Sequence, residues 1–172
     1  MDTLRLGPQN TMLDVVRQLR QMDQVLDRIS SADVPNYEEG AWTPAYAFST
    51  SGSVVATIAA GYFVRIGSVV YITMRIASGT ASTPGPVGNV TITGLPFTSN
   101  STANRRYGLA IGEKFRWGTD MPNLTAVVND NSAVITLYKQ ASNATTLSNV
   151  LATDMTFLTN YNVLVLSGLY FV

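Results

Sequence analysis

The pattern of apolar and polar positions changes once along the chain, from a helical period to a period of two. Between residues 12 and 29, apolar side chains recur at alternating intervals of three and four, which is a heptad seam along one side of a helix. We therefore expect a helix over residues 11–33, with Thr11 as its N-cap and Pro35 blocking its continuation. The seam residues predicted to drive trimerisation are Met12, Val15, Leu19, Met22, Leu26 and Ile29.

Self-association is the interpretation that we favour for this helix. A lone helix of about 18 residues is marginal in water unless its apolar stripe is covered. Val16 and Val25 make the stripe wider than a two-stranded seam needs, and the seam lacks the arrangement of β-branched and Leu residues that favours dimers. The sequence thus predicts a parallel trimeric coiled coil. A helix that packs on its own domain is the alternative.

The segment before the helix, residues 1–10, shows neither period. It contains Leu4, Leu6 and Pro8, a pattern suited to strand addition or to a shallow groove on a partner protein. So short a segment cannot bury enough surface to order by itself, but three linked copies would multiply weak contacts. We interpret it as an N-terminal anchoring tail. The alternative is a terminus without a partner.

From residue 41 onward, after a linker expected over residues 34–40, apolar side chains alternate with polar ones. About nine short strands and no second helical period predict an antiparallel, jelly-roll-like sandwich over residues 41–172. The expected strands include 42–48, 54–58, 62–66, one strand with Val70, Ile72, Met74 and Ile76 on one face, one on which Val90 and Ile92 point inward, 107–117 with a kink at Gly112, a hairpin of 124–128 and 134–138, and 163–172.

The last of these strands is apolar on both faces. Leu164, Leu166 and Tyr170 alternate with Val165 and Leu169. A strand in a two-layer sandwich needs only one buried face, so we expect a neighbouring subunit to cover the other.

Composition excludes several kinds of chemistry. The chain has no Cys and no His, which excludes disulfides, thiolate nucleophiles, imidazole bases and the usual zinc ligands. Its 11 acidic residues balance 11 basic ones, so the charge favours neither nucleic acid nor a membrane surface as a partner. We expect no signal peptide and no membrane insertion, because residues 1–10 lack an apolar core and Arg65 and Arg75 interrupt the most apolar region.

No arrangement of side chains suggests catalysis, a cofactor or a metal. Asp120, Asp130 and Asp154 are isolated in turn-like contexts, and no phosphate-binding loop, nucleophile elbow or metal-ligand spacing occurs. A non-enzymatic binding function remains, and aromatic and basic side chains in loops of a β scaffold are its candidates. The candidate receptor contacts are Arg105, Arg106, Tyr107 and Trp117. An exposed rim is the alternative for the first three, and a core or subunit-interface position for Trp117.

Four stretches of the β region carry a resemblance to a known family. They read, in order, YEEGAWTP (37–44), GYFVRIG (61–67), VTITGLPF (90–97) and SGLY (167–170). This series is similar to that of tailed-bacteriophage virion surface proteins, which show EGTWTP, GxYxRIGN, ITGLPF and a terminal SGxY. The departures are Ala41 in place of Thr, Phe63 and Val64 between the Tyr and the Arg, and Ser68 in place of Asn.

The resemblance implies a trimeric jelly roll on the exterior of a phage particle, hung on short N-terminal helices and made in the host cytoplasm. It carries over no catalytic residue. The function that we favour is a short tail fibre for host adhesion, anchored to another virion protein through the N-terminal tail and binding a host-surface glycan. A capsid cement or head-fibre decoration protein is the alternative. A tailspike depolymerase is disfavoured, because the chain has neither a long β-helix pattern nor paired carboxylates in a groove.

Overall fold

The computed structural model describes residues 16–21, 36–118, 121, 123–141 and 145–172, which belong to two units that meet between Asn36 and Tyr37. In the N-terminal unit, residues 16–21 are helical, as the heptad pattern predicts, and Leu19 is exposed. The other seam positions and the tail residues Leu4, Leu6 and Pro8 lie outside the described residues. Because six helical residues do not make a coiled coil, the trimeric seam stays a prediction.

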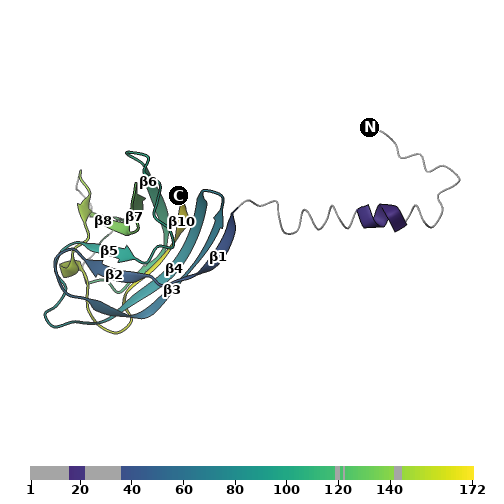
Figure 1. The fold of residues 1–172 in the computed structure, drawn as a ribbon. Coiled ribbons are helices and arrows are strands. Elements are labelled where there is room, and N and C mark those ends of the chain that lie inside the picture. The colour runs from purple at the N-terminus through teal and green to yellow at the C-terminus, as the bar shows by residue number, and fades with distance from the viewer. Residues whose placement is uncertain (1–15, 22–35, 119–120, 122, 142–144) are drawn as a thin grey trace. The chain divides into compact units, whose positions relative to one another are not determined.

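The described residues of the second unit form ten antiparallel strands in one curled sheet, drawn in Figure 1. Their short turns carry Gly and Asn residues with positive φ, such as Gly67 between the third and fourth strands and Asn131 in the predicted hairpin. The strands are β1 (Tyr37–Trp42), β2 (Ala45–Phe48), β3 (Val54–Ile66), β4 (Val69–Ala81), β5 (Val90–Thr93), β6 (Arg106–Phe115), β7 (Asn123–Asn129), β8 (Ile135–Gln140), β9 (Ser148–Asn149) and β10 (Tyr161–Phe171), with a 3-10 turn, η1, at Ala152–Asp154.

The order of the strands explains why the sheet curls. Hydrogen bonds join the strands in the order β1-β3-β4-β10-β6-β7-β8-β5-β2, with β9 beside β8. β1 and β2 are the two ends of this path, yet only Thr43 and Pro44 separate them in the chain. A sheet whose ends are two residues apart must bend back on itself, so its two halves face each other across a shared core.

β6 is the strand at which one half passes into the other. Residues 106–109 pair with β7, whereas residues 110–115 pair with β10. The register with β10 slips by one residue at Gly112, a bulge of the kind that bends a strand, so the kink predicted there is confirmed. We call β1, β3, β4, β10 and residues 110–115 the A half, and residues 106–109, β7, β8, β5 and β2 the B half.

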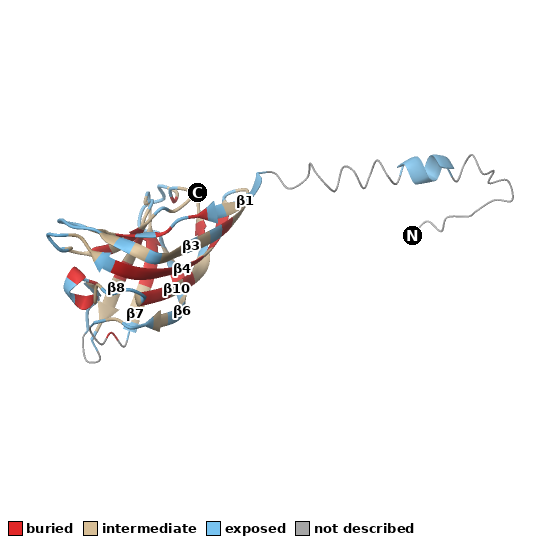
Figure 2. Ribbon diagram, turned by 90° about the horizontal axis from the view of Figure 1, so that it is seen from below, coloured by how far each residue is buried: buried red, intermediate tan, exposed pale blue. Residues whose placement is uncertain are grey.

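Alternate residues of both halves point inward and form one core. Buried positions are dense along β4 and β10, at the centre of the A half (Figure 2). The predicted inward faces Val70, Ile72, Met74 and Ile76, and Val90 and Ile92, are all buried, as the period of two requires. The core also takes Trp42, Phe63, Leu164, Leu166 and Tyr170 from the A half, and Tyr46, Val128, Ile135 and Leu137 from the B half.

Several sequence predictions need correction. The fold is mainly antiparallel β, as expected, but the strand path is one continuous curled sheet and not two jelly-roll sheets, because β6 belongs to both halves. β1 begins at Tyr37, inside the predicted linker 34–40, and the predicted strand 42–48 is split by Thr43 and Pro44. Residues 54–66 form one strand where two were predicted, because Ala59, Ala60 and Gly61 pair with β4 without a break.

Candidate functional site

The outward side chains of the A half form an exposed apolar surface on the described β unit. Residues that are directly opposite on neighbouring strands share a face. Tyr37 is opposite Ile66, and Tyr71 is opposite both Val64 and Leu169, so the surface continues across β1, β3, β4 and β10. We call it the apolar face and define it by Tyr37 (53% exposed), Tyr62 (44%), Ile66 (53%), Tyr71 (46%), Phe115 (52%) and Leu169 (48%).

A carboxylate lies inside this face. Glu39, on β1, accepts hydrogen bonds from the phenols of Tyr37 and Tyr62. These bonds lower the pKa of the Glu39 carboxyl below its usual value and raise the pKa of both phenols. The three side chains are therefore a polar cluster held within an aromatic surface, and the carboxylate is kept charged.

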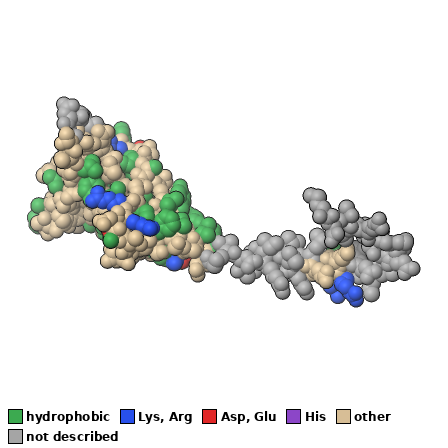
Figure 3. Space-filling view, turned by 90° about the horizontal axis from the view of Figure 1, so that it is seen from above, with side chains coloured by type: hydrophobic (Ala, Val, Ile, Leu, Met, Phe, Trp, Pro, Cys, Tyr) green, Lys and Arg blue, Asp and Glu red, His purple; other side chains and the backbone are tan. Residues whose placement is uncertain are grey.

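Two hollows open on the outer side of the A half, and Arg75 lines both. The first, of about 370 Å³, lies between Tyr62 and Val165. The second, of about 330 Å³, is lined by Glu113 and Phe115. Arg75 is exposed between the two hollows and has aromatic and acidic neighbours. Side chains of a partner could enter the hollows and contact its guanidinium. On the side of the molecule that Figure 3 presents, hydrophobic side chains also reach the surface, with Lys and Arg between them.

Three of the predicted receptor-contact residues lie where β6 begins: Arg105, Arg106 and Tyr107. Both arginines are exposed, and the Arg106 guanidinium lies 5.8 Å from the centre of the Tyr138 ring. Tyr107 is half-buried: its hydroxyl donates to Asn100 Oδ1 at 2.8 Å, and its ring is 5.9 Å from that of Phe171. The arginines are thus accessible, whereas Tyr107 is held mainly by its own domain.

The fourth predicted contact, Trp117, belongs to the core. Its indole N–H donates to the Val163 carbonyl at 3.1 Å, and its ring meets that of Tyr46 edge to face at 6.2 Å. Trp117 packs against the buried cluster and is only half-buried itself. The structure does not bring it together with Arg105 and Arg106, and its position fits the core alternative.

The motif stretches that carry the resemblance meet in space. Trp42 is opposite Gly61, where an added Cβ would lie 2.5 Å from the indole ring. Phe97 packs edge to face on Phe63 at 5.3 Å, and its carbonyl accepts the Tyr170 hydroxyl at 3.0 Å. Each of the four stretches supplies one side of these contacts, so these residues of the motifs pack against one another in the fold.

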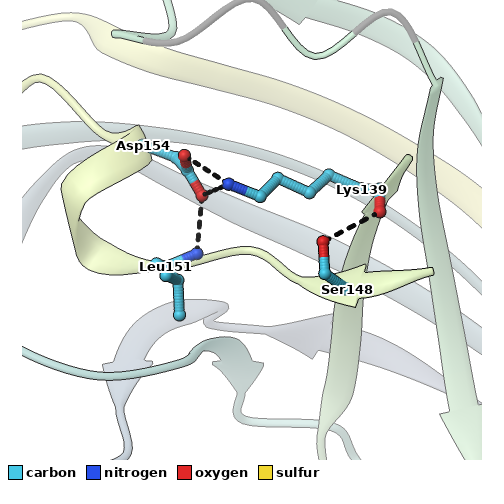
Figure 4. A network of polar contacts seen from close by, with 4 residues as sticks. All are labelled: Lys139, Ser148, Leu151 and Asp154. Carbon is cyan, nitrogen blue, oxygen red and sulfur yellow. Dashed lines mark hydrogen bonds and ion pairs between the residues drawn. The ribbon is translucent and has the colours of Figure 1, made fainter. Parts of the chain in front are cut away.

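Asp154 also has a structural role, as the sequence predicts for a carboxylate in a turn (Figure 4). It caps the 3-10 turn by accepting the Leu151 N–H at 2.8 Å, and both of its oxygens lie 2.6 Å from Lys139 Nζ. Ser148 donates to the Lys139 carbonyl at 3.4 Å. The network ties η1 and β9 to β8, and the carboxylate is almost wholly buried, so it is not available to a substrate.

A buried Asn also joins the two halves. The side-chain amide of Asn162 donates to Ser78 Oγ and to the Thr156 carbonyl, both at 2.6 Å, and the backbone carbonyl of Asn162 accepts the Tyr46 hydroxyl at 2.6 Å. The network joins β10, β4 and β2. Asn162 has φ 48°, a left-handed conformation that Asn tolerates better than most residues.

Within the described part of the chain, no group of three or more acidic, His or Cys side chains is placed to hold a metal ion. None of the described helical segments has the length and apolarity needed to span a bilayer. Among the described residues, the apolar face and the exposed Arg105 and Arg106 are the candidate binding surfaces.

Comparison with known proteins gives one informative likeness. No protein-family model and no curated protein matches the chain. The crystal structure of the Dettilon tailspike protein is similar to it, with a TM-score of 0.60 and 21% sequence identity over 78% of this chain. This chain covers 23% of that protein, so it corresponds to less than a quarter of the tailspike's length. At this identity the likeness establishes a common fold.

Sequence reasoning missed most of the apolar face. The alternation on the last strand indicates Leu169, whereas the sequence pattern places Tyr37 in the linker 34–40 and gives no reason to join Tyr62 and Tyr71 to the same surface. The signal that could have found them is that β3 and β4 are also apolar on both faces, as Val64 and Tyr71 show beside Phe63 and Ile72. Their adjacency needed the strand order, which the sequence does not give.

Proposed function

We propose that the chain is a non-enzymatic surface protein of a tailed-bacteriophage particle, a homotrimeric short fibre that serves host adhesion. The observation that carries the proposal is the likeness of the curled sheet to part of a tailspike protein. The four motif stretches support the proposal independently, because they resemble phage virion proteins and form one packed cluster here.

In this proposal the N-terminal unit assembles and attaches the fibre. The seam Met12, Val15, Leu19, Met22, Leu26 and Ile29 forms a parallel trimeric coiled coil, and the tail with Leu4, Leu6 and Pro8 binds another virion protein. The helical residues 16–21, with Leu19 exposed, agree with a helix that needs a partner.

The receptor-binding part is assigned to the exposed Arg105 and Arg106, beside the aromatic ring of Tyr138. A guanidinium over an aromatic ring offers hydrogen-bond donors and a flat apolar surface, which suits an acidic glycan on the host. Trp117 is left out of this surface, because its indole is engaged with Val163 and Tyr46.

The location is tested by negative-stain microscopy of purified particles with a gold-labelled antibody against residues 37–172. Label at the tail supports the fibre. Label over the capsid supports instead the decoration or cement function, and absence of label from particles contradicts both. Incubation of the protein with host surface polysaccharide tests the enzymatic part: release of new reducing ends would contradict a non-enzymatic role.

Attachment is tested by deleting residues 1–9 and measuring the protein in purified particles. We expect a folded oligomer that is lost from the particle. A sharper version replaces Leu4 and Leu6 with Ser, with Thr3→Ser and Gln9→Ser as the matched control in the same tail. Normal incorporation of the Leu4 and Leu6 variant would place the anchor elsewhere.

A further inference from the structure

We infer that the apolar face is a self-association surface, through which the β units of several copies of this chain pack against one another without help from the helix. The inference deepens the proposed function, since it gives the surface that would hold the β units of the proposed fibre together. It depends, however, on side chains of β1, β3, β4, β10 and the end of β6 and not on the heptad seam.

The size of the face approaches what a stable contact between protein chains needs. β3, β4 and β10 span roughly 36 Å by roughly 14 Å, and the shorter β1 adds roughly 20 Å by roughly 5 Å, so the outer side of the four strands is on the order of 600 Å², polar positions included. Stable interfaces bury about 800 Å² on each partner, whereas the largest apolar patch of an ordinary monomer is about 300–600 Å². The six residues that define the face are between 44% and 53% exposed, so an uncovered chain leaves this whole surface in water.

The composition of the face favours protein over sugar as its occupant. Ile66 and Leu169 are about half exposed and have no group that can hydrogen-bond a hydroxyl. They alternate with Tyr37 and Tyr71, residues of the kind that is enriched in the buried centre of protein interfaces. A glycan would leave the aliphatic part of the face uncovered.

The charges of the face favour a second copy over an unrelated protein. Glu39 and Glu113 carry negative charge, and Arg75 and Arg116 carry positive charge, so the surface is balanced and can complement itself. Among the described residues, neither Arg75 nor Glu113 takes part in a salt bridge. A symmetric assembly would offer each of these charges an opposite charge from a neighbour. A partner whose surface carries charges of a single sign would face two side chains of the same sign on this surface.

The proposed fibre is a trimer, and in it the apolar faces of three copies would surround a common axis. The hollows beside Arg75, of about 370 and 330 Å³, lie on this side of the sheet and would receive side chains of the adjoining copies. The B half would then point outward, with the half-buried Thr91, Thr125 and Thr136 on its outer face.

The experiment uses the full chain with the seam weakened, so that the β units are observed by themselves. In a Leu19→Asp, Leu26→Asp background, sedimentation equilibrium should still give a defined multiple of 18.5 kDa. Adding Leu169→Glu should reduce the mass to that of one chain, or raise the dissociation constant at least a hundredfold. Tyr71→Glu, directly opposite on β4, should do the same.

The matched control is Thr136→Glu in the same background. Thr136 is opposite Thr91 on the outer face of the B half, so it places the same charge on a strand away from the apolar face. It is half-buried and its hydroxyl accepts a hydrogen bond from Asn129 Nδ2 at 3.1 Å, so this control is the more demanding of the two for folding. It should leave the mass unchanged. Far-UV circular dichroism and a cooperative melt check that each variant is folded, and Leu169→Ser serves as a milder replacement if Leu169→Glu does not fold.

A folded seam variant that is monomeric at 50 µM overturns the inference, and so does a folded Leu169→Glu variant that keeps its oligomeric mass. Equal loss of mass in the Leu169→Glu and Thr136→Glu variants also overturns it, because the face would then have no special role. The proposed function fails separately: a defined oligomer that is absent from phage particles contradicts the virion role and leaves the self-association surface standing.

Discussion

The two halves of the curled sheet share one core but present opposite outer surfaces. Outside the A half, aromatic and aliphatic side chains such as Tyr62, Tyr71 and Leu169 are about half exposed. Outside the B half the corresponding cross-strand pairs are Thr91 with Thr136 and Thr125 with Tyr138. Thr is a good strand residue that water solvates, and Val127 beside Thr136 is buried, so the outer face of the B half leaves less apolar side chain exposed than that of the A half.

This difference shows that the alternating pattern predicts the inner face of a strand but does not predict what lies against its outer face. The inner positions of both halves are equally apolar because both contribute to the same core. The residue types at the outer positions depend on what contacts that face of the sheet, either water or another molecule. β10 shows both at once, with Tyr170 buried and its neighbour Leu169 48% exposed.

The largest effect should come from the inner faces, where the halves are alike. Ile76→Ala in β4 and Ile135→Ala in β8 both remove a fully buried side chain. Each should lower the free energy of unfolding by about 2–5 kcal/mol, the usual cost of such a truncation. Denaturant unfolding at one fixed protein concentration measures both. A cost below about 1 kcal/mol in one half only would mean that the halves do not share a core.

A smaller loss of stability is expected from an ion pair that the B half has and that has no counterpart among the described residues of the A half. Asp154→Asn removes the charge that pairs with Lys139 in the B half. The loss should be about 1.5–3 kcal/mol, as for other hydrogen bonds to charged groups. Asp130→Asn, in the turn before β8, is the control and should stay within about 0.5 kcal/mol. Equal costs for the two variants would show that the pair with Lys139 contributes nothing special.

Alkaline pH should weaken the core through its buried phenols. Burial raises the pKa of Tyr170 to about 12, above the value of about 10 for a free phenol, and also raises the pKa of Tyr46. A raised folded-state pKa means that the stabilisation is complete below about pH 10 and is lost as pH rises toward about 12. Melting temperature against pH measures this loss.

Tyr170→Phe tests the assignment of that loss. The variant gives up the hydrogen bond to the Phe97 carbonyl, worth about 1 kcal/mol at neutral pH, and should lose less stability than the wild type between pH 10 and 12. Tyr161→Phe, on the same strand but half-buried, is the control. An unchanged alkaline profile in the Tyr170 variant would contradict the role of this phenol.

The smallest effect concerns the apolar face. The hydrogen bond from Tyr37, and then that from Tyr62, lowers the pKa of Glu39 from its ordinary value of 4.5. Tyr37→Phe should therefore move the Glu39 pKa back toward 4.5, measured by carbon-13 NMR titration in the Leu169→Glu background. Tyr71→Phe, on the same face but without a bond to Glu39, should leave it unchanged. A Glu39 pKa that both variants shift alike would contradict the Tyr37 bond.

Much of the fold could be predicted from local pattern. The inward positions of β4 and β5, the hairpin of β7 and β8, the bulge at Gly112 and the final strand all follow from alternation and turn residues. The candidate site could be predicted less well. Arg105 and Arg106 are exposed as expected, but Trp117 is an aromatic residue whose sequence context does not say whether it points in or out.

By itself the sequence determined that the described β unit is antiparallel, which side chains of each strand point inward, and where the turns lie. These are properties of two or three neighbouring residues. Only the tertiary structure decided that β1 and β2, which Thr43 and Pro44 join in the chain, are the two ends of the sheet, and that Tyr37, Tyr71 and Leu169 lie on one surface. Pairing between strands that are distant in the chain sets such surfaces, because cross-strand neighbours are fixed by register and strand order.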